Sequence, residues 1–328
     1  MMMRYSLVLV ASLFALLLTT AAAQTSETTS LDVIHAESLM SGGKYQDALL
    51  LLNHAIAAHP TDARALVDRG DVYEYLNEQQ TAIADYSAAI AINPDYAYAY
   101  ASRCESRREL NADDAALGDC SHAIELSPHD PYAYRERALI YLDDSDADKA
   151  LQDAQEAVDL DGGSSFGFTV RCRAYVALQR ADDAIRDCTT ALQMGSAMSW
   201  PNYFRGLAEI QKASWSAAAA DFTEALSRAA EGTGAYYWRA LARHNLGLEA
   251  DALTDVSAYI QASPEDGDGY LLRARIQFAL GHAPDALASA QSALHLYRVA
   301  NDTDGMAKTQ AFLQALNAPA PAPAATPH

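Results

Sequence analysis

The strongest constraint on the fold is an internal repeat of 34 residues. Windows that begin at residues 29, 63, 97, 131, 165, 199, 233 and 267 align without a single insertion. The twentieth position of every window is alanine, at Ala48, Ala82, Ala116, Ala150, Ala184, Ala218, Ala252 and Ala286. The eighth position is always small, at Ala36, Gly70, Cys104, Ala138, Cys172, Gly206, Ala240 and Ala274. So strict a period predicts a linear array of similar units that pack mainly on their neighbours.

Each window has the pattern of two helices joined by a short turn. In the second window, ARALVDRGDVYEYL and TAIADYSAAIAI carry apolar residues at helical spacing on either side of Asn77. Pro94 then ends the second helix, because proline disrupts a helix interior. The small residues at positions 8 and 20 allow the two helices to approach closely. A single pair cannot bury its apolar faces alone, so we expect stacked helical hairpins over residues 29–300.

The second window resembles the tetratricopeptide repeat (TPR) family. The residues that carry the resemblance, in the order of the family pattern, are Gly70, Tyr73, Ala82, Tyr86, Ala89 and Pro94. The first window departs from the pattern, with Ala36 and Leu39 where the family often has glycine and tyrosine, as expected of an end repeat. The resemblance implies an all-α, right-handed superhelical solenoid of about eight helix-turn-helix repeats. It also implies a concave groove that binds a protein or a peptide.

The N-terminal residues have the pattern of a secretory signal. Arg4 supplies a positive charge, residues 7–18 form an apolar run, and residues 21–23 are alanines that suit a cleavage site. The alternative is an N-terminal membrane anchor, but the apolar run is shorter than the ~20 residues that span a bilayer. We therefore expect a cleaved signal peptide at 1–23 and a flexible segment at 24–30. The protein would then be exported, either to a periplasm or to the outside.

The C-terminal residues follow a different pattern from the repeats. The sequence NDTD after Val299 indicates a turn, and GMAKTQAFLQALN indicates one further helix. We predict a capping helix within 301–317, in which Met306, Leu313 and Leu316 cover the open end of the last hairpin. The remaining residues, 318–328, are rich in proline and alanine, which predicts a disordered tail.

The charge of the chain excludes two large classes of partner. It has 43 acidic and 23 basic residues, for a formal net charge of −20. Nucleic acids and anionic lipids are bound through lysine and arginine, so neither is an expected partner. No later segment is long and apolar enough for stable membrane insertion after signal cleavage. Composition therefore favours a protein or a peptide as the partner.

Two charged series follow the same period. The seventh position is arginine at Arg69, Arg103, Arg137, Arg171, Arg205, Arg239 and Arg273. The twenty-third position is aspartate at Asp85, Asp119, Asp153, Asp187, Asp221 and Asp255. One interpretation is a basic track for an anionic ligand. The similar numbers and fixed spacing favour Arg–Asp pairs that join helices, either within one repeat or between neighbours.

The four cysteines occupy equivalent positions in two windows. Cys104 and Cys120 are at positions 8 and 24 of the third window, and Cys172 and Cys188 are at the same positions of the fifth. In a hairpin that turns near position 15 or 16, these positions face each other at nearly equal height. Packed helices bring such positions within disulfide reach, and export favours oxidation. The alternative is buried free thiols. We predict the disulfides Cys104–Cys120 and Cys172–Cys188.

The sequence contains no recognisable catalytic or metal-binding motif. The nine histidines include no HExxH pair, and the chain has no GxSxG, GxxxxGK[ST] or strand-linked GxGxxG segment. The acidic stretch 143–150 lacks the glycine and glutamate that a calcium loop requires at fixed positions. We therefore expect no catalytic residue, no metal and no cofactor, and a protein that is not an enzyme.

Positions 2, 5, 9 and 12 of each first helix form one stripe, which faces the concave groove in the TPR family. In the second and third windows the stripe is polar and mixed in charge: Arg64, Val67, Asp71, Glu74, Tyr98, Ala101, Glu105 and Arg108. From the fifth window on it is apolar and aromatic, with scattered arginines. Aromatic residues and arginine dominate binding energy at interfaces. The predicted groove residues are Phe166, Arg173, Trp200, Tyr203, Leu207, Tyr237, Arg275 and Phe278.

These observations predict a non-catalytic scaffold that binds a protein or peptide in its groove, in cell-envelope assembly or maintenance. An apolar or aromatic peptide would be anchored by Trp200, Tyr203 and Tyr237, with its acidic groups at Arg173 and Arg275. The alternative is an accessory or regulatory subunit of an envelope enzyme complex, associated with a glycan. A second alternative for the stripe itself is burial against neighbouring repeats or occupation by the C-terminal tail.

Overall fold

A computed structural model describes residues 31–228 and 232–317 of the protein. The predicted signal peptide (1–23), the N-terminal segment 24–30 and the tail 318–328 lie outside these residues. Within the described part, 17 helices and no strand are present, so the predicted all-α fold of helical repeats is confirmed. The chain divides into two compact units, up to Arg137 and from Ala138 onwards.

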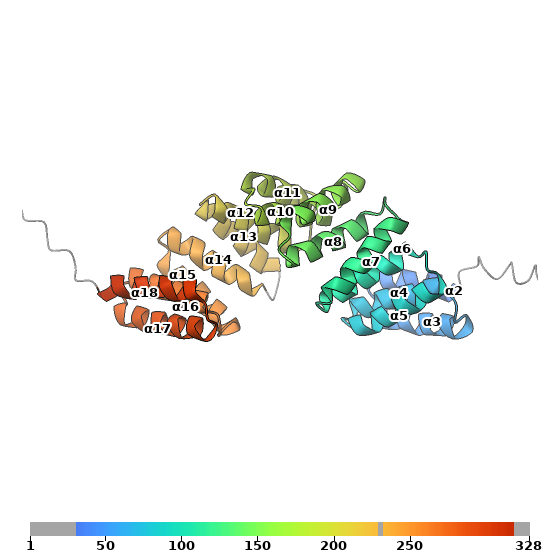
Figure 1. Ribbon diagram of the computed structural model, residues 1–328, viewed down its shortest axis with the longest axis horizontal. Helices are drawn as coiled ribbons and strands as arrows, with labels where there is room; N and C mark the ends of the chain where they lie inside the picture. Colours follow the sequence, from blue (N-terminus) through green and yellow to red (C-terminus); the bar gives the residue numbers. More distant parts are fainter. Residues whose placement is uncertain (1–30, 229–231, 318–328) are drawn as a thin grey trace, which may run out of the picture. The chain divides into compact units, whose positions relative to one another are not determined.

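The first unit consists of successive antiparallel helices (Figure 1). Their bounds are α2 (Leu31–Ser41), α3 (Tyr45–Ala58), α4 (Ala63–Tyr75), α5 (Gln79–Ile92), α6 (Ala97–Glu109) and α7 (Asp113–Leu126). The boundary between the units falls inside α8 (Pro131–Asp143). Each helix from α2 to α6 packs against the next one in the chain. The even-numbered helices are the first helices of the hairpins, and the odd-numbered ones are the second.

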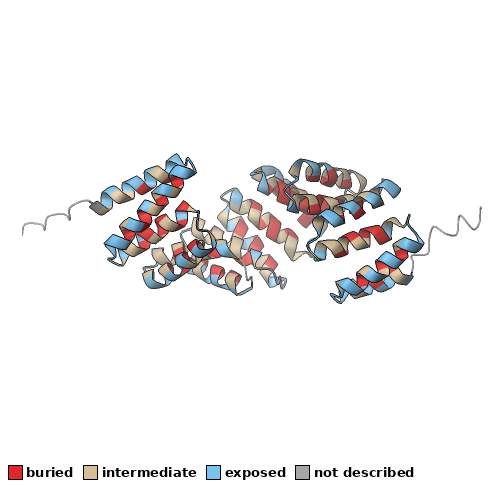
Figure 2. Ribbon diagram, turned by 90° about the horizontal axis from the view of Figure 1, so that it is seen from below, coloured by how far each residue is buried: buried red, intermediate tan, exposed pale blue. Residues whose placement is uncertain are grey.

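The second unit continues the same alternation to the C-terminal end of the described chain. Its helices are α9 (Ala147–Leu160), α10 (Ser165–Ala177), α11 (Ala181–Gln193), α12 (Trp200–Gln211), α13 (Trp215–Arg228), α14 (Thr233–Asn245), α15 (Glu249–Ala262), α16 (Gly267–Ala279), α17 (Ala283–Val299) and α18 (Thr303–Asn317). In both units the buried residues lie along the facing sides of the helices (Figure 2). No helix of the described chain combines the length and the hydropathy that crossing a membrane requires.

The turn inside every hairpin has the same backbone geometry. Position 15 of each window has a positive φ, at Gly43, Asn77, Asn111, Ser145, Gln179, Ala213, Gly247 and Gly281. A residue in the left-handed region ends the first helix and turns the chain back towards the second. Glycine and asparagine suit this region, whereas a residue such as Ala213 adopts it at a cost.

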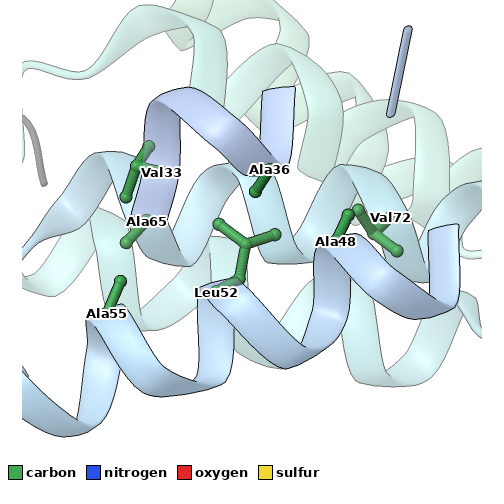
Figure 3. Packing of buried hydrophobic residues seen from close by; sticks show 7 residues of the cluster. All are labelled: Val33, Ala36, Ala48, Leu52, Ala55, Ala65 and Val72. Atoms are coloured by element: carbon green, nitrogen blue, oxygen red, sulfur yellow. The ribbon is translucent and has the colours of Figure 1, made fainter. Parts of the chain in front are cut away.

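Positions 8 and 24 face each other across the hairpin, and their volumes are complementary. Gly70 lies under the ring of Tyr86, and a Cβ atom added to this glycine would be 2.6 Å from the ring. Gly206 lies in the same way under Phe222, at 2.8 Å. In the first hairpin, Ala36 faces Leu52 in a cluster that also includes Val33, Ala48, Ala55, Ala65 and Val72 (Figure 3). A small residue on one helix therefore makes room for a large one on the other.

The two predicted cystine pairs occupy these facing positions. Cys104 is bonded to Cys120 and Cys172 to Cys188, with Cα atoms 5.5 Å apart in both pairs. The described chain contains no free cysteine. All four side chains are fully buried. Each unit thus holds one hairpin in which a covalent bond replaces the packing of a large side chain against a small one.

The arginines at position 7 join two neighbouring hairpins. Their guanidinium groups form bidentate ion pairs, at 2.5 to 3.0 Å, with aspartates of the same hairpin: Arg69–Asp85, Arg103–Asp119, Arg171–Asp187, Arg205–Asp221 and Arg239–Asp255. A third nitrogen of each donates to a neutral side chain of the preceding hairpin, namely Asn53, Ser87, Gln155, Thr189 or Thr223. The ion pairs of these five arginines therefore lie within repeats, while their contacts with the preceding repeat are made to neutral side chains. These guanidinium groups are engaged in structural contacts, which argues against the basic-track interpretation.

The last helix, α18, lies over the end of the final hairpin. Met306 and Phe312 pack against a cluster formed by Leu271, Ala293 and Tyr297. Tyr297 donates a hydrogen bond to Asp268 at 2.5 Å. Leu313 and Leu316, which were predicted to cover this end together with Met306, are half-buried.

Candidate functional site

The predicted groove residues all lie on first helices of the second unit. Phe166 and Arg173 are on α10, Trp200, Tyr203 and Leu207 on α12, Tyr237 on α14, and Arg275 and Phe278 on α16. Among these, the side chains of Trp200, Arg275 and Phe278 are exposed, and the others are half-buried. The stripe is thus accessible to solvent, and most of its half-buried side chains are aromatic or aliphatic.

Three of these residues meet at one pocket of about 360 Å³. Arg173, Trp200 and Tyr203 line it together with Phe204 and the first residues of α14. Trp200 remains 44% exposed. Its ring centroid is 6.2 Å from that of Phe204 in an edge-to-face arrangement and 6.5 Å from that of Phe166. Such packing holds the indole in place while leaving part of its surface free for a ligand.

Among the described residues that line this pocket, Arg173 supplies the only charged side chain. Its guanidinium carbon lies 5.9 Å from the centre of the Phe204 ring, within range of a cation–π interaction. A guanidinium nitrogen is 2.6 Å from a carboxylate oxygen of Asp143. Both side chains are partly exposed, so a ligand carboxylate can compete with Asp143 for this group.

Helix α14 lies close to the Tyr203 hydroxyl group because Gly234 carries no side chain. A Cβ atom at this position would lie 3.1 Å from the hydroxyl oxygen of Tyr203. Burial raises the pKa of Tyr203, so its hydroxyl stays neutral and can donate a hydrogen bond at physiological pH. Helix α14 begins after Gly232, which has no side chain to accept hydrogen bonds from the first amide groups of the helix. The pocket therefore combines aromatic area, one guanidinium group and polar donors.

The other predicted groove residues have different neighbours. Leu207 packs into a cluster with Ala218 and Phe222. Tyr237 lies against Trp238 and Tyr259, with ring centroids 5.1 and 5.3 Å apart. Burial and, to a smaller extent, Asp268 and Asp266 raise the pKa of Tyr237 to about 12.

Phe278 makes an edge-to-face contact of 6.0 Å with Phe312 of α18. Arg275 is exposed and lowers the pKa of Tyr237, which indicates that its guanidinium group lies near the Tyr237 hydroxyl group. The lining of the pocket includes neither of these residues, nor Leu207 or Tyr237.

Sequence reasoning missed Phe204 and the start of α14. Phe204 occupies position 6, which the stripe of positions 2, 5, 9 and 12 does not include. A signal was nevertheless present, because GTG at 232–234 precedes a helix and glycine permits close approach. Across the described residues, no three histidine, cysteine, aspartate or glutamate side chains converge in a way that could hold a metal ion.

The tetratricopeptide repeat model matches residues 35–97 and 203–267, one segment in each unit. No curated protein matches the sequence at a significant level. Among solved structures, the chain is similar to one from the APC/C hetero-tetramer Cut9–Hcn1, with a TM-score of 0.71 and 12% identity. That match covers 88% of this chain and 55% of the other, so this chain spans about half of the related one.

Two further structures share the fold at low identity. A tetratricopeptide repeat protein from Parabacteroides merdae has a TM-score of 0.55 and 17% identity, over 76% of this chain and 98% of that one. The human IFIT1 dimer with m7Gppp-AAAA has a TM-score of 0.58 and 13% identity, over 81% of this chain and 71% of that one. With the repeat pattern, the matched segments show that both units contain tetratricopeptide repeats, and the solved structures show the same helical-repeat fold. Such repeats typically serve as scaffolds that bind peptides or proteins.

Proposed function

We propose that the second unit binds a peptide segment of a protein partner, with an apolar or aromatic side chain in the pocket beside Trp200. The observation that carries this proposal is the exposed indole at a pocket that also contains a guanidinium group. Solvent contact gives no stability to such an aromatic surface, and exposed apolar patches of this kind mark binding sites. Arg173 would receive a carboxylate of the peptide in place of Asp143.

The remaining groove residues extend this contact surface along α14 and α16. Tyr237 and Phe278 would contact further apolar side chains of the peptide, and Arg275 a second acidic group. This arrangement suits a peptide that alternates apolar and acidic residues.

We further propose that the protein acts outside the cytoplasm, in assembly or maintenance of the cell envelope. The two buried disulfides support this proposal, since cystines persist in oxidising compartments. The signal-like N-terminus gives the same indication. Binding needs no catalytic group, so the protein would act as a scaffold and not as an enzyme.

The test is capture of partners from the exported fraction of the source cells, followed by cross-linking and mass spectrometry. Trp200→Ala should weaken capture by about 30-fold, the loss typical of an interface residue worth ~2 kcal/mol. Leu248→Ala is a matched control, because Leu248 is 48% exposed in the same unit and lies outside the pocket. Both variants should keep the melting temperature of the wild type.

Capture that survives Trp200→Ala would place the binding site elsewhere. If the captured partner is a catalytic protein, or if a glycan is retained, the protein is an accessory subunit of an enzyme complex. Tyr203 is unsuitable for the same test, since it packs into the core beside Phe222 and its truncation would destabilise the unit.

A further inference from the structure

The first unit carries a second pocket with a different chemistry. It has a volume of about 520 Å³, and its walls include Arg64, Asp68, Asp71, Tyr75, Tyr96 and Tyr98. All of these residues belong to α4, α6 and the turn before α6. Glu37 on α2 completes the lining on one side. Acidic and aromatic side chains therefore surround one cavity.

The carboxylates in and beside this pocket form an acid cluster, which consists of Asp68, Asp71, Glu74, Glu105 and Glu136. Neutral hydroxyl groups donate hydrogen bonds to the carboxylates of three of its members. Tyr86 and Tyr98 donate to Asp71 at 2.8 and 3.2 Å. Tyr132 donates to Glu105, and Ser106 donates to Glu74. These hydroxyl groups hydrogen-bond the carboxylates but do not neutralise their charge.

The arginines nearest the acid cluster contact Glu37, Asp68 and Glu136 and leave its other members without an ion pair. Arg64 forms a close ion pair with Glu37 and is 4.0 Å from Asp68. Arg108 and Arg135 both lie on Glu136, at 3.5 and 3.2 Å. In the described chain, no ion pair joins a cation to Asp71, Glu74 or Glu105. Oδ2 of Asp68, a residue in the pocket wall, is buried and has no hydrogen-bond partner among the described residues.

Burial and the neighbouring carboxylates raise the pKa values of these groups. Burial raises the pKa of Asp68 to about 7, and the neighbouring carboxylates Asp71 and Glu37 raise it further than Arg64 lowers it. Burial likewise raises the pKa of Asp71 to about 6 and that of Glu74 to about 8. The first unit thus holds carboxyl groups that an added positive charge would stabilise in their ionised form.

The aromatic walls restrict the ligand further. Tyr75 is 62% exposed and Tyr98 is 40% exposed, so parts of both rings are free. The Tyr75 ring is held by stacking on Tyr45, at 4.7 Å between centroids. A cation is attracted to the face of an aromatic ring as well as to a carboxylate. An anionic ligand would be repelled here, and an apolar ligand would leave the charge of Asp68 and Asp71 uncompensated.

We propose that this pocket binds a lysine or arginine side chain of a basic peptide segment, held between Asp68 and Asp71 and against the rings of Tyr75 and Tyr98. The positive charge of the peptide complements a lining in which carboxylates outnumber the single guanidinium group of Arg64. The inference goes beyond the proposed function, because it assigns a separate surface on the other unit to a ligand of opposite charge. The protein would then bind two different peptide segments.

Binding of the cation should release protons. Around Asp68 the titratable groups are Glu37 on α2, Arg64 and Asp71 on α4, and Tyr96 before α6. Around Glu74 they are Asp71 on the same helix, Tyr86 on α5 and Glu105 on α6. Since a bound cation favours the ionised carboxylates, affinity should rise as the pH increases from 6 to 8.

The experiment measures binding of a labelled lysine-rich decapeptide to the full-length protein by fluorescence anisotropy. The same peptide with every lysine acetylated is the ligand control. We expect the lysine peptide to bind and the acetylated peptide to bind at least 10-fold more weakly. Asp68→Asn combined with Asp71→Asn should weaken binding of the lysine peptide at least 10-fold. Tyr75→Ala, which removes a ring that is 62% exposed, should weaken it about 3-fold.

A matched protein variant separates the pocket from the overall charge. Asp95→Asn combined with Glu125→Gln changes the net charge of the first unit equally, and both side chains are exposed outside the pocket. This variant should bind as the wild type does. Equal loss in both double variants, equal binding of the acetylated peptide, or no binding of the lysine peptide would each overturn the proposal. Trp200→Ala should leave this binding unchanged, so the outcome is independent of the site in the second unit.

Discussion

The two units present the same positions of the same repeat with opposite chemistry. In the first unit, positions 9 and 12 of α4 carry Asp71 and Glu74, whose carboxylates are satisfied by hydroxyl groups. In the second unit, Trp200 at position 2 of its window (α12) and Arg173 at position 9 of its window (α10) line an aromatic pocket. The backbones and hairpin contacts are alike, so the scaffold does not determine the ligand. The comparison shows that a few positions per repeat define each surface while the rest maintain the hairpin.

The largest effect we expect is loss of a disulfide, which tests whether the two units depend equally on their cystines. Replacing Cys104 and Cys120 by alanine removes a closed loop of 16 residues and should destabilise the first unit by about 3 kcal/mol. Replacing Cys172 and Cys188 should do the same to the second unit. All three tryptophans lie in the second unit, so their fluorescence reports its unfolding alone.

Denaturant titrations monitored by tryptophan fluorescence and by hydrogen exchange measure the unfolding of the two units separately. The variant that lacks Cys104 and Cys120 should show faster hydrogen exchange in residues up to Arg137. The denaturant concentration at the midpoint of its fluorescence transition should stay that of the wild type. Equal shifts in both probes for either variant would show that the units unfold together. Peptide mapping without reductant provides the control that both linkages form in the wild type.

The second prediction concerns pH, to which the two units should respond differently. In the first unit the folded-state pKa of Asp68 and Glu74 is raised to about 7 and 8. Below pH 4 these carboxyls are protonated in both states, whereas between pH 4 and 8 the folded state binds protons that the unfolded state has released. The stability of the first unit should therefore fall as the pH rises, by on the order of 2 kcal/mol between pH 5 and 8.

Glu74→Gln should reduce this slope and raise stability at pH 8. Glu109→Gln is the control, since Glu109 is an exposed carboxylate of the same unit. Hydrogen exchange measures the stability of each unit, once the observed rates are corrected for the pH dependence of intrinsic amide exchange. A first unit that becomes more stable from pH 5 to pH 8 would contradict the raised pKa values.

The smallest effect concerns the left-handed turn residues. The first unit uses Gly43, Asn77 and Asn111 at this position, all of which tolerate a positive φ, whereas the second unit includes Gln179 and Ala213. Ala213→Gly should stabilise the second unit by about 0.5–1 kcal/mol, because it relieves the backbone strain at φ 55°. Ala219→Gly, inside helix α13, is the control and should destabilise it by a similar amount. Tryptophan fluorescence during denaturation measures both, and a loss of stability with Ala213→Gly would rule out strain at this turn.

Much of the fold could be predicted from local spacing. The period of 34 residues predicted the hairpins, and the equivalent positions of Cys104 and Cys120 predicted their pairing, because positions 8 and 24 are opposite each other in any such hairpin. The sequence did not indicate that Arg69 joins Asp85 of its own repeat and Asn53 of the preceding one. That choice depends on the distance between stacked hairpins, which no spacing along the chain contains.

The candidate sites show the same division. The sequence by itself determined which positions share one face of a helix, since helical periodicity places Trp200 and Tyr203, or Asp71 and Glu74, on the same side. Only the tertiary structure decided that Phe204 and Gly234 line a pocket beside Trp200, and that Asp71 and Glu74 are half-buried beside hydroxyl groups of other helices. Enclosure and desolvation arise when side chains from neighbouring hairpins exclude water. They therefore depend on the packing of several repeats at once, whereas the order of residues within one repeat determines only the direction in which each side chain points.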